Sequence, residues 1–308
     1  MGAAIEVRDL RKVYGDRVAV DGLSLTIADG EVYALLGHNG AGKSTTVEIL
    51  EGHRTRTSGD VHVLGIDPGR AGPAFRDRIG IVLQTSGIEH ELTVREVLEV
   101  YGSTYVRRRP DEEVLDLAGL TEQADQRIGT LSGGQRRRVD LALGIIGTPD
   151  VLFLDEPTTG FDPTARRGAW DVVRQLGAGG TTILLTTHYL DEAEHLADRV
   201  GVIANGRLIA EGTPAELIGG AIATVVRFEL PLGVSVADLD GVLPDGATIN
   251  DRRVVEFSTL APTRDVHRVC GWALERGMEL TGLAVARPSL EDAFLALTGE
   301  PDEAAVTG

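Results

Sequence analysis

The chain has 308 residues, a length that suggests about two domains. Apolar residues make up 42% of it and charged residues 25%, which is enough for a real hydrophobic core and ordinary for a soluble protein. The formal net charge is −17, and this argues against a general attraction to nucleic acid or to anionic lipid. No nucleic-acid partner is therefore expected.

Cysteine usage and hydropathy bear on the compartment. Cys270 is the only cysteine, so no disulfide can form within the chain, which fits a reducing compartment. The first residues mix charged with apolar side chains and lack the core of a signal peptide. No apolar stretch approaches the roughly 18 residues that a membrane helix needs. We therefore expect a soluble chain that serves a membrane, if at all, through a partner.

Strands and helices alternate over the first two thirds of the chain. Apolar runs bounded by turn residues predict strands at residues 5–7, 23–27, 32–36, 61–63, 79–83, 151–154, 182–185 and 200–204. Apolar residues at helical spacing predict helices at residues 43–50, 163–176 and 189–198, and a mostly helical stretch at 93–147. Thr93 is the expected N-cap of that stretch. The pattern indicates an α/β core with a helical insertion.

The composition changes near residues 219–220, where two glycines stand together. Beyond them, strands are predicted at residues 224–230, 253–257 and 280–286, and helices at residues 264–276 and 289–297. Ser289 is the expected cap of the last helix. This tail predicts a separate small α+β domain of roughly 80 residues.

A glycine-rich loop directly follows the predicted strand 32–36. Residues 37–45 read Gly-His-Asn-Gly-Ala-Gly-Lys-Ser-Thr and fit the pattern Gly-x-x-x-x-Gly-Lys-Ser. Glycines let backbone N–H groups converge on one anion, and the helix that starts there adds the positive end of its dipole. Lys43 can reach the β and γ phosphates of a nucleotide, and Ser44 can place its hydroxyl on Mg²⁺. The candidate nucleotide-binding residues here are Gly37, Asn39, Gly40, Ala41, Gly42, Lys43, Ser44 and Thr45.

Two adjacent carboxylates end the predicted strand 151–154. Neighbouring side chains on a strand point to opposite faces, so Asp155 and Glu156 can address different targets. Asp155 can hold Mg²⁺, and Glu156 can take a proton from an attacking water. The alternative is a solvated acidic turn, which the phosphate loop upstream disfavours.

Residues 131–135, Leu-Ser-Gly-Gly-Gln, combine a hydroxyl, two glycines and the start of a helix. That combination predicts a second anion-binding helix N-terminus, formed by Ser132, Gly133, Gly134 and Gln135. The sequence alone does not say where this second helix N-terminus lies relative to the loop at residues 37–45.

Other polar features have plainer interpretations. The basic runs 107–109 and 136–138 are expected to be solvated helix faces. His188 and His195 lie too far apart on a helix to share a metal without further ligands, so His195 is expected at the surface. Trp170 and Trp272 are expected in a core or an interface.

In their chain order these motifs resemble those of the ATP-binding subunit of an ABC transporter, over residues 1–218. Residues 37–45 match the Walker A loop, and residues 131–135 match the ABC signature without a substitution. Asp155 matches the Walker B aspartate, and Glu156 matches the catalytic glutamate.

Four single residues match further motifs of this family. Tyr14 matches the aromatic residue that stacks on adenine, although it could also be an ordinary turn residue. Gln84 matches the Q-loop glutamine, and Asp162 lies in the match to the D-loop. His188 matches the switch histidine of the H-loop. The ordered set of motifs is much more specific than any one of them.

The resemblance implies a P-loop NTPase core of the ABC ATPase type over residues 1–218. It has a helical signature subdomain near residues 90–147 and is followed by the small α+β domain at 222–300. In this family two copies pair head to tail, and the signature of one closes over the ATP held by the other. The implied cofactors are ATP and Mg²⁺. The implied partners are a second copy and integral membrane permease subunits, at the cytoplasmic face of the cell membrane.

The resemblance also implies residue roles. Ser132 and Gly134 would contact the γ-phosphate of the partner's ATP. Gln84 would sense Mg²⁺ and water and link to the membrane subunit, and His188 would touch the γ-phosphate. The implied catalytic set is Glu156, His188, Gln84 and Lys43, and the implied metal set is Ser44, Gln84 and Asp155.

The tail narrows the subfamily. Residues 287–299, Arg-Pro-Ser-Leu-Glu-Asp-Ala-Phe-Leu-Ala-Leu-Thr-Gly, look like the ending of daunorubicin-resistance-type drug-exporter ATPases. His38 and Val139 depart from common family residues, at positions that are not catalytic. We therefore expect an ATPase motor of an exporter of drugs or lipid-like molecules, with a link to antibiotic resistance.

Two other functions stay open. An importer ATPase would carry an identical motor, so only its tail and its partner would differ. A soluble ABC ATPase without a transport role is the other alternative. A kinase that uses the phosphate loop would not explain residues 131–135. The tail domain is expected to stabilise the dimer and to regulate it, or to contact the membrane subunit.

Overall fold

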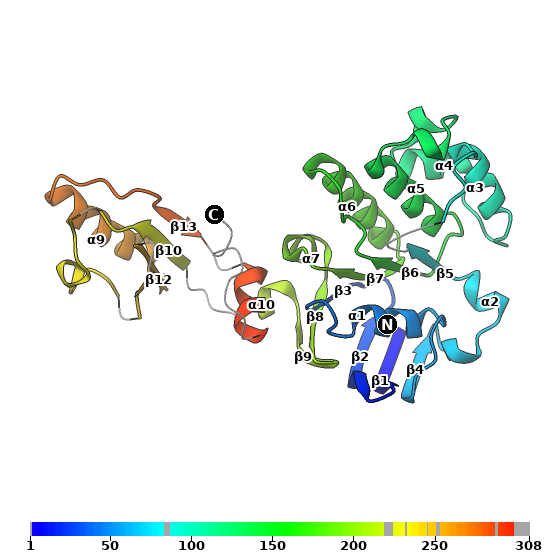
Figure 1. Cartoon of the computed structure of the whole chain (residues 1–308), viewed down its shortest axis with the longest axis horizontal. Coiled ribbons are helices and arrows are strands. Elements are labelled where there is room, and N and C mark those ends of the chain that lie inside the picture. The colour runs from blue at the N-terminus through cyan, green and yellow to red at the C-terminus, as the bar shows by residue number, and fades with distance from the viewer. Residues whose placement is uncertain are drawn as a thin grey trace. The chain divides into compact units, whose positions relative to one another are not determined.

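The computed structural model describes residues 2–82, 87–218, 224–231, 233–244, 246–250, 253–286 and 289–298. The chain divides into two compact units, Met1–Pro214 and Ala215–Gly308 (Figure 1). Gln84 lies outside the described residues, as do residues 287–288 and 299 of the predicted C-terminal ending.

A six-stranded sheet forms the centre of the first unit. Its strand order is β5-β6-β7-β3-β8-β9, and only β9 is antiparallel to its neighbour. The strands are β3 Val32–Leu36, β5 Ile79–Val82, β6 Val151–Asp155, β7 Thr182–Thr187, β8 Arg199–Ala204 and β9 Arg207–Gly212. β3 and β7 are buried along their whole length, which is why they read as continuous apolar runs. The carboxyl ends of the parallel strands share one edge, and the predicted motifs follow β3, β6 and β7 there.

A second, antiparallel sheet of the first unit has the order β2-β1-β4. Its strands are β1 Ala3–Tyr14, β2 Arg17–Ala28 and β4 Ser58–Val63. β1 and β2 form a hairpin whose turn contains Gly15, with a φ of 55°. Apolar side chains of this sheet share one buried cluster with residues of the six-stranded sheet, among them Leu35 and Phe153. The hairpin is thereby held beside the glycine-rich loop.

Eight helices longer than one 3₁₀ turn are described in the first unit and at its boundary. They are α1 Lys43–Leu50, α2 Pro73–Arg76, α3 Val94–Gly102, α4 Asp111–Leu117, α5 Gly133–Ile145, α6 Pro163–Ala178, α7 Leu190–Leu196 and α8 Pro214–Leu217. Short 3₁₀ turns lie at Pro68–Arg70, Thr121–Gln123, Ile128–Thr130 and, in the second unit, Val236–Leu239. α3, α4 and α5 lie together and contact one another (Figure 1). Thr93 caps α3 in a capping box with Glu96, as the sequence predicts.

The second unit is a four-stranded antiparallel sheet with a helix packed on it. The strand order is β11-β12-β10-β13, with β10 Thr224–Glu229, β11 Thr248–Ile249, β12 Val254–Thr259 and β13 Ala284–Ala286. The helices are α9 Pro262–Glu275 and α10 Leu290–Thr298. Phe228 and Phe257 of the sheet belong to one buried cluster with Trp272 of α9, whose Nε1 donates to the Asp238 carbonyl at 3.1 Å. This unit therefore has a core of its own.

Several elements differ from the prediction. β1 and β2 are longer than expected, β13 is shorter, and β9, α2 and β11 were not predicted.

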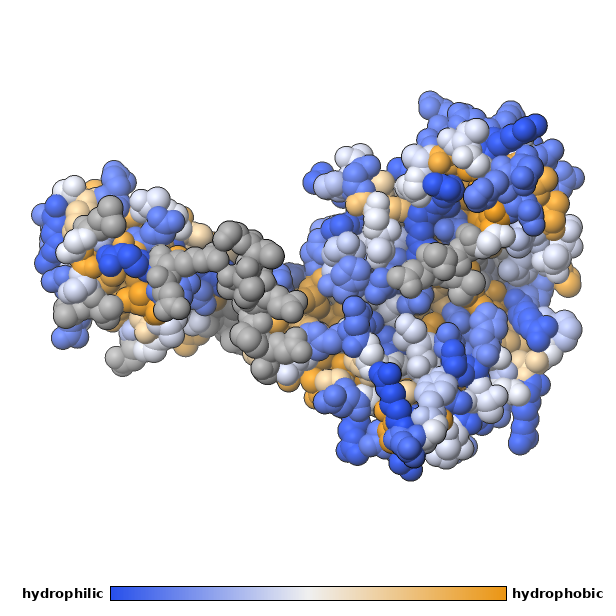
Figure 2. Space-filling model, viewed as in Figure 1, coloured by the Kyte–Doolittle hydropathy of each residue, from blue (hydrophilic) through white to orange (hydrophobic). Residues whose placement is uncertain are grey.

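The face of the first unit in Figure 2 is mostly hydrophilic, with hydrophobic patches between. In the part of the chain that the structure describes, no helix has both the length and the apolar character to cross a membrane.

Candidate nucleotide-binding and catalytic site

Close backbone contacts explain why glycine occupies two positions of the loop between β3 and α1. A Cβ at Gly37 would lie 2.4 Å from the carbonyl oxygen of Ile203 in β8, and one at Gly42 would lie 2.5 Å from that of Ala19 in β2. Gly42 is also the N-cap of α1 with a φ of 109°, which a residue with a Cβ rarely adopts. The loop is therefore wedged between two strands, with the N-terminus of α1 facing its opening.

Lys43 is the first residue of α1 and is buried. Its Nζ donates to the carbonyl oxygens of Gly37 and, at 3.1 Å, of His38. Burial lowers the pKa of this amine, while the negative charges of Glu156 and Asp155 raise it. The amine is thus held at the mouth of the loop, between the loop carbonyls and the two carboxylates.

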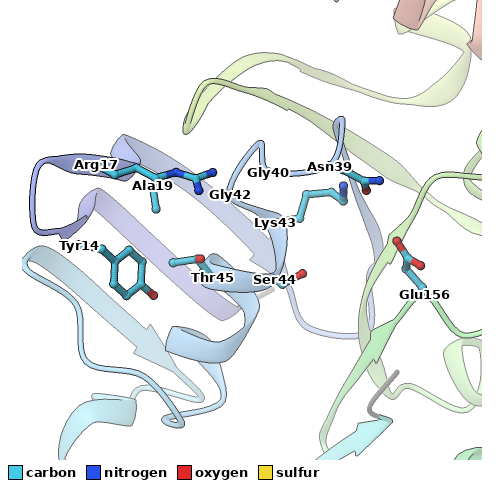
Figure 3. A pocket seen from close by; sticks show the side chains of 10 residues that line it. All are labelled: Tyr14, Arg17, Ala19, Asn39, Gly40, Gly42, Lys43, Ser44, Thr45 and Glu156. Carbon is cyan, nitrogen blue, oxygen red and sulfur yellow. The ribbon is translucent and has the colours of Figure 1, made fainter. Parts of the chain in front are cut away.

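A pocket of about 290 Å³ opens in front of the loop (Figure 3). It is lined by Tyr14, Arg17, Ala19, Asn39, Gly40, Gly42, Lys43, Ser44, Thr45 and Glu156. In Figure 3 the Lys43 amine and the Glu156 carboxylate point towards the same space from opposite walls. The structure thus brings together Tyr14, most of the predicted loop residues and Glu156.

The β1–β2 hairpin supplies one wall of this pocket. Tyr14 is 38% exposed, and the Lys12 Nζ lies 4.7 Å from the centroid of its ring. Arg17 of β2 also lines the pocket, and its guanidinium lies beside Gly40 of the loop. Arg17 was not predicted as a site residue, because its place in the pocket follows from the packing of the hairpin against the loop and no local sequence pattern marks it.

Asp155 and Glu156 diverge at the end of β6. Thr186 of β7 donates through its hydroxyl to Asp155 Oδ1 at 2.5 Å and so orients that carboxylate. Glu156 has a φ of 48°, and its N–H donates to the Thr186 carbonyl at 3.0 Å. Thr159 donates through its hydroxyl to Glu156 Oε2 at 3.2 Å. The two carboxylates therefore accept hydrogen bonds from different threonines.

His188 follows β7 and meets Glu156. Its Nδ1 lies 3.3 Å from Glu156 Oε1, and its ring centroid lies 4.1 Å from that of Tyr189. The Tyr189 N–H donates to the Thr187 hydroxyl at 2.9 Å, which tightens the turn that carries the histidine. The structure therefore pairs two residues that the sequence places far apart.

A buried carboxyl group lies behind this turn. Glu192 of α7 is fully buried, and Trp170 of α6 donates through Nε1 to Glu192 Oε1 at 3.0 Å. Burial raises the pKa of Glu192, while the hydrogen bond from Trp170 opposes this shift. Trp170 and Glu192 thereby join α6 to α7, the helix that follows the His188 turn.

The signature residues start a helix, as predicted. The Gln135 N–H donates to Ser132 Oγ at 3.2 Å, and the Ser132 N–H donates to Gln135 Oε1 at 2.9 Å, which is a capping box. Ser132 and Gly133 are exposed. None of residues 132–135 is among those that line the pocket in front of the loop.

Asp162 is the N-cap of α6. Its Oδ1 accepts from the Thr164 and Ala165 N–H groups, both at 2.8 Å. These two backbone hydrogen bonds hold the pKa of the Asp162 carboxyl below its usual range. Asp162 is exposed and does not line the pocket either.

Arg137 corrects the expectation for residues 136–138. It is 7% exposed, whereas a solvated helix face was predicted. Its guanidinium donates to the carbonyl oxygens of Asp155 at 2.9 Å, Glu156 at 2.9 Å and Pro157 at 3.2 Å. Three consecutive arginines carry no apolar residue whose spacing would mark one face as buried, so the burial of the middle one cannot be read from the sequence.

Two family comparisons cover the two units separately. A family described as "ABC transporter" matches residues 20–159. A family described as "ABC transporter domain-containing protein-like, C-terminal domain" matches residues 224–289.

Curated relatives match along nearly the whole chain. "Daunorubicin resistance ATP-binding protein DrrA3" of Streptomyces coeruleorubidus is 42% identical over 96% of this chain and 96% of its own length. "Daunorubicin/doxorubicin resistance ATP-binding protein DrrA" of Streptomyces peucetius is 41% identical over 97% of this chain and 93% of its own length. "Nod factor export ATP-binding protein I" of Burkholderia lata is 41% identical over 96% of this chain and 97% of its own length.

Solved structures match a smaller part of the chain. The ATP-binding subunit of an ABC transporter superposes with a TM-score of 0.64 at 27% identity, covering 70% of this chain and 91% of that one. A dimeric bacterial ABC transporter cassette superposes with a TM-score of 0.61 at 25% identity, covering 68% of this chain and 98% of that one. The similar fold therefore extends over about the length of the first unit.

Proposed function

Because the chain belongs to the family of ABC transporter ATP-binding subunits, as its motifs predict, we propose that it is the ATP-hydrolysing motor of an exporter for drugs or lipid-like molecules. The observation that carries this is the Glu156–His188 pair, 3.3 Å apart, across the pocket from the Lys43 loop. Relatives named for daunorubicin resistance and Nod factor export favour an exporter over an importer or a soluble ATPase.

ATP occupies the pocket in front of the loop. The N–H groups at the start of α1 and the Lys43 amine face the β and γ phosphates, and the Arg17 guanidinium adds positive charge on the hairpin side. Tyr14 stacks on the adenine ring, with Lys12 behind it. The adenine contact is the least specific of these, because it rests on one aromatic side chain.

Hydrolysis transfers the γ-phosphoryl group of ATP to water and yields ADP and phosphate. Glu156 accepts the proton of the attacking water, since its carboxylate faces the pocket. His188 holds that carboxylate in place and contacts the γ-phosphate. Thr159 fixes the second carboxylate oxygen.

Oxygen ligands suited to Mg²⁺ lie beside the pocket. Ser44 lines it with an exposed hydroxyl, and Asp155 presents a carboxylate that Thr186 orients. These two residues would hold the ion, with Gln84 as the third predicted ligand. Bound Mg²⁺ supplies positive charge that offsets the negative charge of the phosphates.

A second copy completes the site. Ser132 and Gly134 lie at an exposed helix N-terminus that does not line its own chain's pocket, so they are available to the ATP of a partner. The dimeric cassette among the solved relatives supports this head-to-tail pairing. Asp162, exposed at the start of α6, belongs to the same interface.

A groove of about 870 Å³ is the proposed docking surface for a permease subunit at the cytoplasmic face of the membrane. It is lined by residues of segments 73–78 and 104–107, namely Pro73, Ala74, Arg76, Asp77, Arg78, Thr104, Tyr105, Val106 and Arg107. Val106 is 89% exposed, which is unusual for an apolar residue beside a groove. The mixture of apolar and arginine side chains suits a cytoplasmic segment of the permease with apolar and acidic residues. A polytopic permease should co-purify with the chain from solubilised membranes.

Glu156→Gln tests the proposed motor. The variant should bind ATP with unchanged affinity but hydrolyse it at least about 100-fold more slowly, because an amide cannot take the proton. Since the closed dimer reopens only after hydrolysis, ATP should convert the variant into a stable dimer. Size-exclusion chromatography with light scattering, with and without ATP, measures this. Hydrolysis at the wild-type rate would exclude Glu156 as the base.

A further inference from the structure

We propose that Arg137 is a positioning residue for ATP hydrolysis, which fixes the backbone on both sides of Glu156 and ties it to the signature helix α5. The inference rests on the proposed function, because it assigns Arg137 a role in the same hydrolysis step. It concerns a residue that is not among those lining the pocket.

The contacts of Arg137 are concentrated on one short segment. Its Nη2 donates to the carbonyl oxygens of Asp155 and Glu156, both at 2.9 Å, and its Nε donates to that of Pro157 at 3.2 Å. Its Nη1 lies 3.7 Å from Asp140 Oδ2, one turn along the same helix. One planar guanidinium therefore holds three consecutive peptide groups, with the Glu156 peptide in the middle.

The backbone at Glu156 needs such support. Its φ of 48° lies in the left-handed region, which is unfavourable for a residue with a side chain. A strained conformation persists only where its surroundings fix it in several places. Arg137 holds the carbonyl side of the turn, while the Glu156 N–H donates to the Thr186 carbonyl on the other side.

The guanidinium charge of Arg137 is buried, which is unfavourable unless its N–H groups are hydrogen-bonded. Arg137 is 7% exposed, and burial lowers its pKa, while the negative charges of Asp140, Asp155 and Glu156 raise it. A buried guanidinium is tolerated when its donors are used, and carbonyl oxygens accept them here. The contact geometry of a planar fork cannot be reproduced by the single ammonium of lysine.

The same side chain links two functional segments. α5 starts at Gly133, directly after its cap Ser132, and Arg137 lies about one turn into it. A helix transmits a displacement of its N-terminus along its axis. When a partner's nucleotide engages Ser132 and Gly134, any shift of α5 therefore reaches the peptide groups around Glu156 through Arg137.

Arg137→Met, Arg137→Lys and Arg136→Met in the full-length chain test this role. Arg136 is the matched control, since it is an exposed arginine next to Arg137 on the same helix. We measure kcat for ATP hydrolysis, the Kd of a fluorescent ATP analogue and the melting temperature. Arg137→Met should lower kcat roughly 10- to 100-fold, because a small misplacement of a catalytic group has effects of this size. The Kd should stay within about twofold, and Arg136→Met should match the wild type.

Arg137→Lys decides the question if the methionine variant does not fold. Lysine keeps the charge but can meet fewer of the three carbonyls, so kcat should fall to an intermediate value with an unchanged Kd. An Arg137→Lys kcat equal to that of the wild type would overturn the proposal. Equal losses in kcat, affinity and melting temperature would also overturn it, since they indicate a purely structural residue. The proposed function itself fails only if the wild-type chain hydrolyses no ATP.

Discussion

At the scale of single residues, Glu51 shows how burial changes a side chain beside the site. It follows α1 as its C-cap, is 5% exposed and lies 3.3 Å from His53 Nδ1 through Oε2. Burial raises the pKa of its carboxyl to about 8, and the negative charges of Asp155 and Glu48 add to the effect. At neutral pH this carboxyl is therefore mostly protonated, so it does not add a full negative charge next to the Walker B strand.

Glu51→Gln should change how the stability of the chain depends on pH. The unfolded carboxyl releases its proton near pH 4.5, whereas the folded one keeps it up to about pH 8. Between pH 4.5 and about pH 8 the folded chain therefore binds one proton more than the unfolded chain. In this range the free energy of unfolding falls as pH rises, by up to about 1.4 kcal/mol per pH unit. Glutamine does not titrate, so the Glu51→Gln variant lacks this pH-dependent decrease. Its free energy of unfolding should therefore rise relative to that of the wild type from pH 5.5 to 8.

Urea unfolding of both proteins at pH 5.5, 7 and 8.5 measures the difference. Glu99→Gln is the control, because Glu99 is exposed on α3 and should show no such trend. A free-energy difference between the wild type and Glu51→Gln that stays constant over this range would exclude a raised pKa at Glu51.

Residues differ in how far the sequence reveals them. Lys43 and Glu156 stand in local patterns whose chemistry needs only neighbouring residues, so the sequence predicts them. Arg137, Arg17 and Glu51 acquire their roles from burial or from a neighbouring segment, which no local pattern encodes. Their surroundings come from segments that are distant in the sequence, such as the end of β6 for Arg137.

At the scale of elements, the loop between β3 and α1 depends on its contact with β8. A methyl group at Gly37 would lie 2.4 Å from the carbonyl oxygen of Ile203 and 2.7 Å from the Cγ2 atom of that residue. Because the nearest atom is backbone within a sheet, the loop would have to move away. Gly37→Ala should therefore destabilise the chain by about 1–3 kcal/mol and weaken ATP binding.

Differential scanning fluorimetry and titration with a fluorescent ATP analogue measure both effects. Gly72→Ala is the matched control, because a Cβ at Gly72 meets no atom within 4 Å and the residue has no positive φ. A Gly37→Ala protein with the melting temperature and affinity of the wild type would show that the loop does not need its close approach to β8.

The elements differ in how clearly their sequence pattern predicts them. The parallel strands and long helices carry buried apolar runs or helical spacing, and their predictions hold. β9 is an edge strand whose residues are mostly half-buried or exposed, so it lacks a clear apolar signal. β1 contains a bulge near Asp9, with a φ of 49°, and this irregularity shortens the alternating pattern that predicts a strand.

At the scale of the whole molecule, each unit has its own buried core, so each can act as a structural module. The solved cassettes match about the length of the first unit, while the curated exporter relatives match both units. The second unit therefore accompanies the motor in the relatives named for drug resistance and Nod factor export. We propose that it stabilises the dimer rather than takes part in the chemistry.

Removal of the second unit tests that proposal. A chain that ends at residue 218 keeps the pocket, the Glu156–His188 pair and Arg137. In the Glu156→Gln background it should still bind ATP, but it should need a roughly tenfold higher protein concentration to form the ATP-dependent dimer, which corresponds to about 1.4 kcal/mol. Analytical ultracentrifugation over a concentration series compares it with the full-length Glu156→Gln protein. If both dimerise at the same concentration, the second unit does not stabilise the dimer, and regulation or contact with the permease remain as its proposed roles.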